Sequence, residues 1–442
     1  MTDDMPIVGK TKPGELTMDQ IASMQPGLNR LPLQNKRIVL GICGGIAAYK
    51  AADLASKLTQ AGAQVDCIFT ESAARFVTPL TFASVTGRKA FTDADLWDAS
   101  AHVPHVGLGT QANLIVIAPA TANTLAKLAQ GLADNLLTVT TLAARCPVLV
   151  APAMDAGMWD HPATQANIAT LRDRSIILVG PERGRMASGL IGLGRMTEPG
   201  DILGHIRLAL GRSGPLAGRR IVVTAGGTQE PLDPVRYVGN RSSGKQGFAL
   251  AQAALDRGAS VTLIAGATAS LPTPIGAARV DVMTAAQMQS AVLEACCNSD
   301  ALLMAAAVAD FRPAQVAGHK IKKTADSGAP QITLERTADI LTAIHAARNE
   351  MPRLRVVVGF AAETQNLLAN AQNKLAAKGL DLIVANDVSA SDAGFGVDTN
   401  RVTLLDRDGR AETLPLMSKA AVAEAVMDRV VTLLASSGPQ DR

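Results

Sequence analysis

Short apolar runs alternate with amphipathic segments along this 442-residue chain. The first run, from Arg37 to Ile42, precedes a Gly-Gly turn and a helical pattern from Ile46 to Ala61. Short strands that alternate with helices are typical of a parallel sheet covered on both faces. We therefore expect a doubly wound α/β domain whose further strands lie at residues 65–70, 113–120, 146–153 and 175–180.

The same order of elements begins again after a Gly-, Ser- and Pro-containing stretch at residues 211–218, which has the composition of a linker. A strand at 219–228 leads through a Gly-containing loop into a helix from Gln246 to Gly258, and Asp408-Gly409 indicates a late hairpin. We predict two Rossmann/flavodoxin-like domains in tandem, with these parts: extension 1–35, first domain 36–210, linker 211–218, second domain 219–435 and tail 436–442.

Composition and charge limit the classes of function that this chain can have. Hydrophobic residues make up 48% of the chain and aromatic residues only 3%, which suits parallel sheets flanked by helices. A net charge of +3 from 42 basic and 39 acidic side chains is too mixed for nucleic-acid binding, so we expect small-molecule substrates. The chain has no membrane-length apolar run and no CxxC pair among its five cysteines, which indicates a cytoplasmic protein.

The second domain carries a candidate phosphate loop. Ser242, Ser243, Gly244 and Lys245 lead into a helix, whose free N–H groups and dipole favour a phosphate. A solvated turn is the alternative. Asp310 follows another predicted strand, and KIKK at 320–323 is, without further context, a solvated basic surface.

Taken in order, DPVRYVGNRSSGKQG, AAAVADFRP, KIKK and GFAAET closely resemble the phosphopantothenoylcysteine synthetase domain of the bifunctional coenzyme A biosynthesis proteins. The resemblance implies CTP-dependent ligation of cysteine to 4′-phosphopantothenate through an acyl-cytidylate, with CTP as co-substrate and Mg²⁺ on its phosphates. The resemblance implies that Asn240, with Arg236 nearby, stabilises this intermediate, and that Lys320 offsets the negative charge of the phosphates. Asp310 is the expected Mg²⁺ ligand. The implied nucleotide contacts are Met304, Ala305, Ala306, Asp310, Lys320, Ala338, Asp339, Ile340, Leu341, Phe360, Lys374 and Lys378.

In the first domain, GICGGIAAYK, FTESA and APATANT resemble the flavin-binding cysteine decarboxylases. The resemblance implies FMN as cofactor and His105, in VPHVGLG, as a catalytic residue. A sheet of the same kind without a cofactor is the alternative. The implied FMN contacts are Gly44, Gly45, Ile46, Ala47, Thr70, Pro119, Thr121 and Asn123.

Two further catalytic positions of the decarboxylases are changed here. Asp155 stands where their PxMNxxMW motif has asparagine, and Ser188 stands at the cysteine before a Gly-rich flap. An ionised Asp155 beside a substrate carboxylate would cost about 4 kcal/mol at ~4 Å and an effective dielectric of ~20. A serine hydroxyl is also far less acidic than a thiol of pKa ~8.5, so the reductive step is expected to be slow.

Several functions remain open for the first domain. It could decarboxylate if the changes at Asp155 and Ser188 have an unforeseen compensation, or it could bind FMN or assemble subunits without decarboxylating. A flavin oxidase with an altered thiol product is a third possibility, whereas a nicotinamide oxidoreductase is disfavoured because GxGxxG and YxxxK are missing. The resemblance also implies a homo-oligomer, with trimeric flavin domains and dimeric ligase domains.

Overall fold

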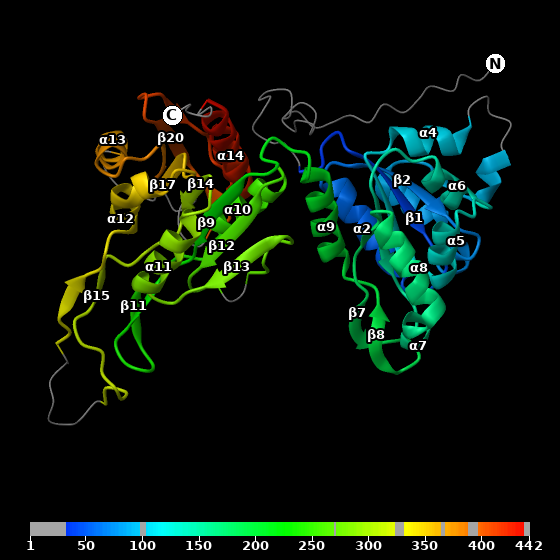
Figure 1. The fold of residues 1–442 in the computed structure, drawn as a ribbon, viewed down its shortest axis with the longest axis horizontal. Coiled ribbons are helices and arrows are strands. Elements are labelled where there is room, and N and C mark those ends of the chain that lie inside the picture. Colours follow the sequence, from blue (N-terminus) through cyan, green and yellow to red (C-terminus); the bar gives the residue numbers. More distant parts are fainter. Residues whose placement is uncertain are drawn as a thin grey trace, which may run out of the picture.

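The computed structural model describes residues 32–97, 103–268, 271–322, 331–363, 367–387 and 397–436. It contains two α/β bodies, the first drawn from blue to green and the second from green to red in Figure 1. This confirms the predicted fold class of two doubly wound domains in tandem. Residues 1–31 of the predicted extension lie outside the described residues. Leu33 is buried in the first core, so folded chain begins before residue 36.

The first sheet has six parallel strands in the order β3-β2-β1-β4-β5-β6. They are β1 (Arg37–Ile42), β2 (Gln64–Phe69), β3 (Ala90–Phe91), β4 (Leu114–Ala120), β5 (Val148–Pro152) and β6 (Ile177–Leu178). One face packs against α2 (Ala48–Gln60), α3 (Pro79–Thr86) and α9 (Pro199–Gly211). The other packs against α4 (Pro104–Gln111), α5 (Ala122–Gln130), α6 (Leu136–Leu142), α7 (Ala156–Asp160) and α8 (Pro162–Asp173). A hairpin of β7 (Glu182–Arg185) and β8 (Ile191–Arg195) and short helices η1 (Ala73–Arg75) and η2 (Asp93–Trp97) complete the domain.

Burial on both faces explains why the strands appear as continuous apolar runs. In β1, Ile38, Leu40 and Ile42 pack into the core beneath α2 and α9, whereas Val39 packs into the core on the opposite face. Successive side chains of a strand point to opposite faces, so a strand covered on both sides needs apolar residues throughout. The match between the predicted and observed bounds of β1 follows from this.

The second sheet has eight strands in the order β13-β12-β9-β14-β17-β18-β20-β21. They are β9 (Arg220–Ala225), β12 (Ser260–Ala265), β13 (Ala277–Asp281), β14 (Ala301–Met304), β17 (Val356–Glu363), β18 (Leu382–Asp387), β20 (Val402–Asp406) and β21 (Ala411–Thr413). The last two are antiparallel and form the predicted hairpin, with Gly409 at φ 81°. On one face lie α10 (Lys245–Leu255) and α14 (Lys419–Ser436), and on the other α11 (Ala285–Cys296), α12 (Ile340–Ala347) and α13 (Leu367–Ala377).

Short strand pairs extend from this domain. They are β10 (Gln229–Pro231) with β11 (Tyr237–Gly239), β15 (Phe311–Pro313) with β16 (Leu334–Arg336), and β19 (Thr399–Asn400) with β22 (Met417–Ser418); η3 (Arg348–Glu350) follows α12. Figure 1 shows β11 and β15 reaching below the sheet. None of these pairs was predicted, because strands of two or three residues carry no periodicity.

The predicted linker packs against the second domain. Leu216 is buried in its core, and the Leu216 N–H donates to the Arg257 carbonyl at 2.8 Å. Arg207 of α9 forms an ion pair with Asp256, which follows α10. The domains therefore touch where α9 meets the end of α10. Among the described helices, none is long and apolar enough to cross a membrane.

Candidate functional sites

The first site lies where the strand order of the first sheet reverses. β2 flanks β1 on one side and β4 on the other, so the loops after β1 and β4 diverge, and ligands of doubly wound sheets bind in such crevices. The Cys43 N–H donates to the Pro119 carbonyl at 3.3 Å, and the Thr124 hydroxyl donates to Cys43 Sγ at 3.2 Å. The structure thus brings together the two loops predicted to hold FMN.

The two glycines after β1 have different surroundings. A Cβ at Gly44 would lie 2.3 Å from Ser72 Cβ, whereas a Cβ at Gly45 would meet no atom within 4 Å. Thr70 lies beside this turn, because its N–H donates to the Ile42 carbonyl at 3.1 Å. Gly44 is needed for the loops to pack, and Gly45 borders open space. Ile46 and Ala47 continue the same turn into α2.

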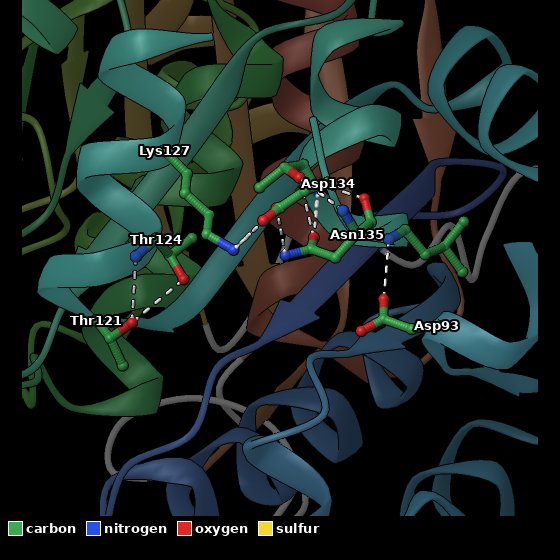
Figure 2. Close-up of polar contacts among 8 residues, drawn as sticks. Asp93, Thr121, Thr124, Lys127, Asp134 and Asn135 are labelled. Carbon is green, nitrogen blue, oxygen red and sulfur yellow. Dashed lines mark hydrogen bonds and ion pairs between the residues drawn. The ribbon is translucent and has the colours of Figure 1, made fainter. Parts of the chain in front are cut away.

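Thr121 precedes α5 and fixes the second loop. Its side chain accepts a hydrogen bond from the Thr124 N–H at 3.3 Å, which caps the helix (Figure 2). Farther along, Lys127 Nζ lies 2.8 Å from both carboxylate oxygens of Asp134, and Asn135 caps α6. These contacts hold α5 and α6 together beside the crevice. The predicted contact Asn123 lies exposed in the first turn of α5.

The three predicted catalytic residues of the first domain fall into two groups. His105 is the second residue of α4, and its buried Nδ1 has no hydrogen-bond partner among the described residues. Within the same residues, no hydrogen bond or ion pair joins His105 to Asp155 or Ser188.

Asp155 and Ser188 contact each other directly. The Ser188 hydroxyl donates to Asp155 Oδ2 at 2.8 Å, and the Gly157 N–H donates to Asp155 Oδ1 at 3.0 Å. Asp155 is the residue that caps α7, and Ser188 lies at the tip of the β7–β8 hairpin, where Gly189 has φ 85°. The two positions that depart from the decarboxylase pattern are therefore one structural unit, which spacing in the sequence could not reveal.

The second site is a cavity of about 720 Å³ at the carboxyl edge of the second sheet, where the strand order reverses between β9 and β14. α10 and α14 reach it from one face, and α12 and α13 from the other. Eleven of the twelve nucleotide contacts implied by the sequence line it, together with Asn240. They are Met304, Ala305, Ala306, Asp310, Ala338, Asp339, Ile340, Leu341, Phe360, Lys374 and Lys378.

Two predicted residues lie outside this cavity lining. The Arg236 guanidinium binds the Asp233 carboxylate, Nε to Oδ2 at 2.9 Å, and donates to the Ile321 carbonyl at 2.7 Å. This guanidinium, with three backbone N–H groups, holds the pKa of Asp233 well below its usual range. Lys320 is exposed beside Ile321. Arg236 thus organises the segment that carries Lys320.

The polar groups of the cavity are partly paired with each other. Asn240 Nδ2 donates to the Val308 carbonyl at 2.9 Å. Asp339 caps α12 and pairs with Lys378 at 2.9 Å; burial opposes ionisation of Asp339, but Lys378 and the Thr342 N–H outweigh it and lower its pKa. No cluster of three or more His, Cys, Asp or Glu side chains suited to a metal occurs in the described parts of the chain, so Asp310 lies in no such protein cage.

Sequence reasoning missed several cavity residues from the face covered by α10 and α14. Lys419 begins α14, and no sequence motif marks it. Asn386 lies near the end of β18, and Asn400 ends the two-residue strand β19. The only available signal was Lys419 itself, a lysine at a predicted helix start.

Together, the fold and the sites define a two-domain α/β protein with a flavodoxin-like crevice in the first domain and a cavity at the carboxyl edge of the second sheet. Residues 28–210 match the family described as Flavoprotein. Residues 216–434 match the family described as DNA/pantothenate metabolism flavoprotein C-terminal domain.

Two relatives match this chain along almost their whole length, and one solved structure matches its second half. The coenzyme A biosynthesis bifunctional protein CoaBC of Mycobacterium tuberculosis is 50% identical over 410 residues, covering 90% of this chain and 97% of its own length. That of Bacillus subtilis is 46% identical over 409 residues, covering 92% and 99%. A crystal structure of the C-terminal domain of a CoaBC protein matches 51% of this chain and 100% of its own, at 37% identity and a TM-score of 0.43.

The chain belongs to the family of the coenzyme A biosynthesis bifunctional proteins. The expected enzyme of coenzyme A biosynthesis, with a flavoprotein domain of the decarboxylase type and a ligase domain, is confirmed at the level of this family.

Proposed function

We propose that the second domain joins cysteine to 4′-phosphopantothenate with CTP, and that the cavity at the carboxyl edge of its sheet is the active site. The observation that carries this proposal is the convergence in one cavity of Asn240 with nearly all the residues expected to bind the nucleotide. These residues come from β14, β17, α12, α13 and the loops next to them. Their assembly around one space is what a ligase of this kind requires.

The chemistry divides into two displacements. The carboxylate of 4′-phosphopantothenate attacks the α-phosphate of CTP, which releases pyrophosphate, and the amine of cysteine then displaces CMP from the acyl-cytidylate. Asn240 suits the stabilisation of that intermediate because its amide donates hydrogen bonds without adding charge. Lys374 and Lys378 supply positive charge. Mg²⁺ on the phosphates needs few protein carboxylates, and Asp310 is the candidate.

For the first domain we propose FMN as the cofactor. The open space at Gly45, the N-terminus of α5 and the buried, unpartnered Nδ1 of His105 suit a ligand with phosphate and ring polar groups. When bound, FMN would supply the oxidation of the substrate's thiol end and its reversal. The chain's own residues hold the crevice and position polar groups around it.

The contact between Asp155 and Ser188 favours a first domain that does not complete the decarboxylation. In this contact the Ser188 hydroxyl proton is directed to Asp155 Oδ2, not to a substrate. Both oxygens of Asp155 accept hydrogen bonds, and a negative charge on this carboxylate would repel a substrate carboxylate placed beside it. A decarboxylase in which the pair compensates is the second candidate.

A homo-oligomer is proposed for the same chain. Ile46 and Tyr49, which follow the turn at Gly45, are each 62% exposed. Large apolar side chains at a binding loop are expected to be covered by another subunit. We propose that the flavin domains form trimers, which would cover these side chains, and that the ligase domains form dimers. Sedimentation velocity of the full chain would measure the number of subunits.

One experiment tests the proposed reactions. The purified full chain is incubated with 4′-phosphopantothenate, CTP, Mg²⁺ and cysteine, and the products are identified by mass spectrometry, with Asn240→Ala as the matched control. Phosphopantothenoylcysteine with CMP supports the ligase, and the absence of both would exclude it. Formation of 4′-phosphopantetheine would show that the Asp155–Ser188 pair permits decarboxylation.

A further inference from the structure

Lys419 lies in the wall of the second cavity at the point where two helices begin. It is the first residue of α14, and Lys245 is the first residue of the neighbouring α10. The Gln246 side chain joins the two helix ends, because its Nε2 donates to the Lys419 carbonyl at 3.2 Å. Two lysines and two helix N-termini therefore meet at one end of the cavity.

Three features of this position disfavour a positive charge. Lys419 is only 8% exposed, so its ammonium group loses most of its hydration. It stands at the positive end of the α14 dipole, where acidic residues are preferred. Lys245 adds a like charge. Burial is the main cause that lowers the pKa of Lys419 and Lys245 adds to it, while Asp398 partly opposes them.

A carbonyl and a carboxylate lie near this charge. Lys419 Nζ donates to the Val397 carbonyl at 2.5 Å, which supplies a dipole but no charge. Asp398 lies close by, but its carboxylate is 83% exposed and binds Lys245 Nζ at 2.6 Å. An anion in the cavity would offset these unfavourable features, because it would be attracted by both lysines and by both helix N-termini.

We propose that Lys419 is a phosphate-binding residue which, with Lys245, holds the two terminal phosphates of the nucleoside triphosphate, the part that leaves as pyrophosphate. Ser242 and Gly244 precede α10 at the same end of the cavity. Lys374 and Lys378 approach from the other face of the sheet, at α13. The inference rests on the proposed function, since it takes the cavity to bind a nucleoside triphosphate.

Binding measurements on the full chain test this proposal. Titration calorimetry in Mg²⁺ uses inorganic pyrophosphate, CTP and CMP as probes. The variants are Lys419→Met, which removes the charge at similar length, and Lys419→Arg, which keeps it. Lys57→Met is the control, because Lys57 is a lysine of α2 in the first domain that pairs with Asp53. Thermal unfolding of each ligand-free variant is measured alongside.

The expected result combines weaker binding with undiminished stability. Lys419→Met should lower the affinity for pyrophosphate and for CTP about tenfold or more, as loss of a charge-assisted hydrogen bond does. It should lower the affinity for CMP by less than about threefold. Its ligand-free unfolding midpoint should equal or exceed that of the unmodified chain. Lys419→Arg should retain most of the affinity for pyrophosphate and CTP. Lys57→Met should leave the affinities for all three ligands unchanged.

Two results would overturn the inference: unchanged pyrophosphate and CTP affinity in Lys419→Met, or a lowered midpoint with equal loss of all three ligands, which would assign Lys419 a structural role. Failure of the ligase proposal gives a different pattern. In that case the unmodified chain would form no phosphopantothenoylcysteine, while its affinity for pyrophosphate would still depend on Lys419.

Discussion

Replacing Ser188 with alanine should release the tip of the β7–β8 hairpin from α7. The substitution removes the 2.8 Å hydrogen bond from Ser188 to Asp155. Hydrogen bonds to charged groups contribute about 1.5–3 kcal/mol, but Ser188 is exposed to water, so we take about 1 kcal/mol. The equilibrium for opening of the tip should then rise about fivefold. Global stability should hardly change, because the Met154 N–H still donates to the Gly194 carbonyl at the base of β8.

Limited trypsin digestion measures this opening, since Arg183 and Arg185 lie in β7 next to the tip. When opening is fast relative to cleavage, the rate follows the open population, so cleavage after Arg185 should accelerate about fivefold in Ser188→Ala. Ser188→Thr keeps the hydroxyl and is the matched control. A double-mutant cycle with Asp155→Ala should show that the two effects are not additive. Equal cleavage rates, or strictly additive effects, would refute the proposed link between α7 and the hairpin.

Three further predictions concern the two sites. Gly44→Ala should destabilise the chain by about 1–3 kcal/mol in urea unfolding and lower its flavin content, because the added Cβ has no room, whereas Gly45→Ala should leave stability unchanged. Asn240→Ala should reduce ligase turnover about 10²- to 10³-fold while CTP affinity, measured by calorimetry, stays within about threefold. Asp339→Ala should lose about 1 kcal/mol of stability at pH 7, since it removes the α12 cap and the Lys378 pair. Because the folded-state pKa of Asp339 is lowered, this difference should disappear as the pH falls through that pKa, below the ordinary value of about 3.9.

Most of the sheet architecture could be predicted because it depends on local patterns. β1, β4, β9, β12 and β17 are buried on both faces, so each appears in the sequence as an apolar run close to its observed bounds. The location of both sites follows from the order of these strands, since ligands bind where that order reverses. The glycine-containing loops after β1 and β9 lie at these two points.

The remaining parts depend on contacts that local patterns do not encode. β7 is the polar segment ERGR, and β10 and β15 have three residues each, too short for alternation to register. The contact of Asp155 with Ser188 joins positions 33 residues apart, and the approach of Lys419 to the first turn of α10 joins positions 173 apart. Such pairs become visible only when the helices and hairpins are placed on the sheet.

Asp155 and Lys419 show how a local rule separates a structural explanation from a functional one. Asp155 is unusual against the decarboxylase pattern, yet a carboxylate that caps a helix is favourable, and its two hydrogen bonds account for it without any ligand. Lys419 belongs to none of the sequence motifs, yet a buried cation at a helix N-terminus beside another lysine is a position that a bound anion would stabilise. Residues that break local rules are expected where function requires them. The same reasoning therefore assigns Asp155 to the architecture of the first domain and Lys419 to ligand binding in the second.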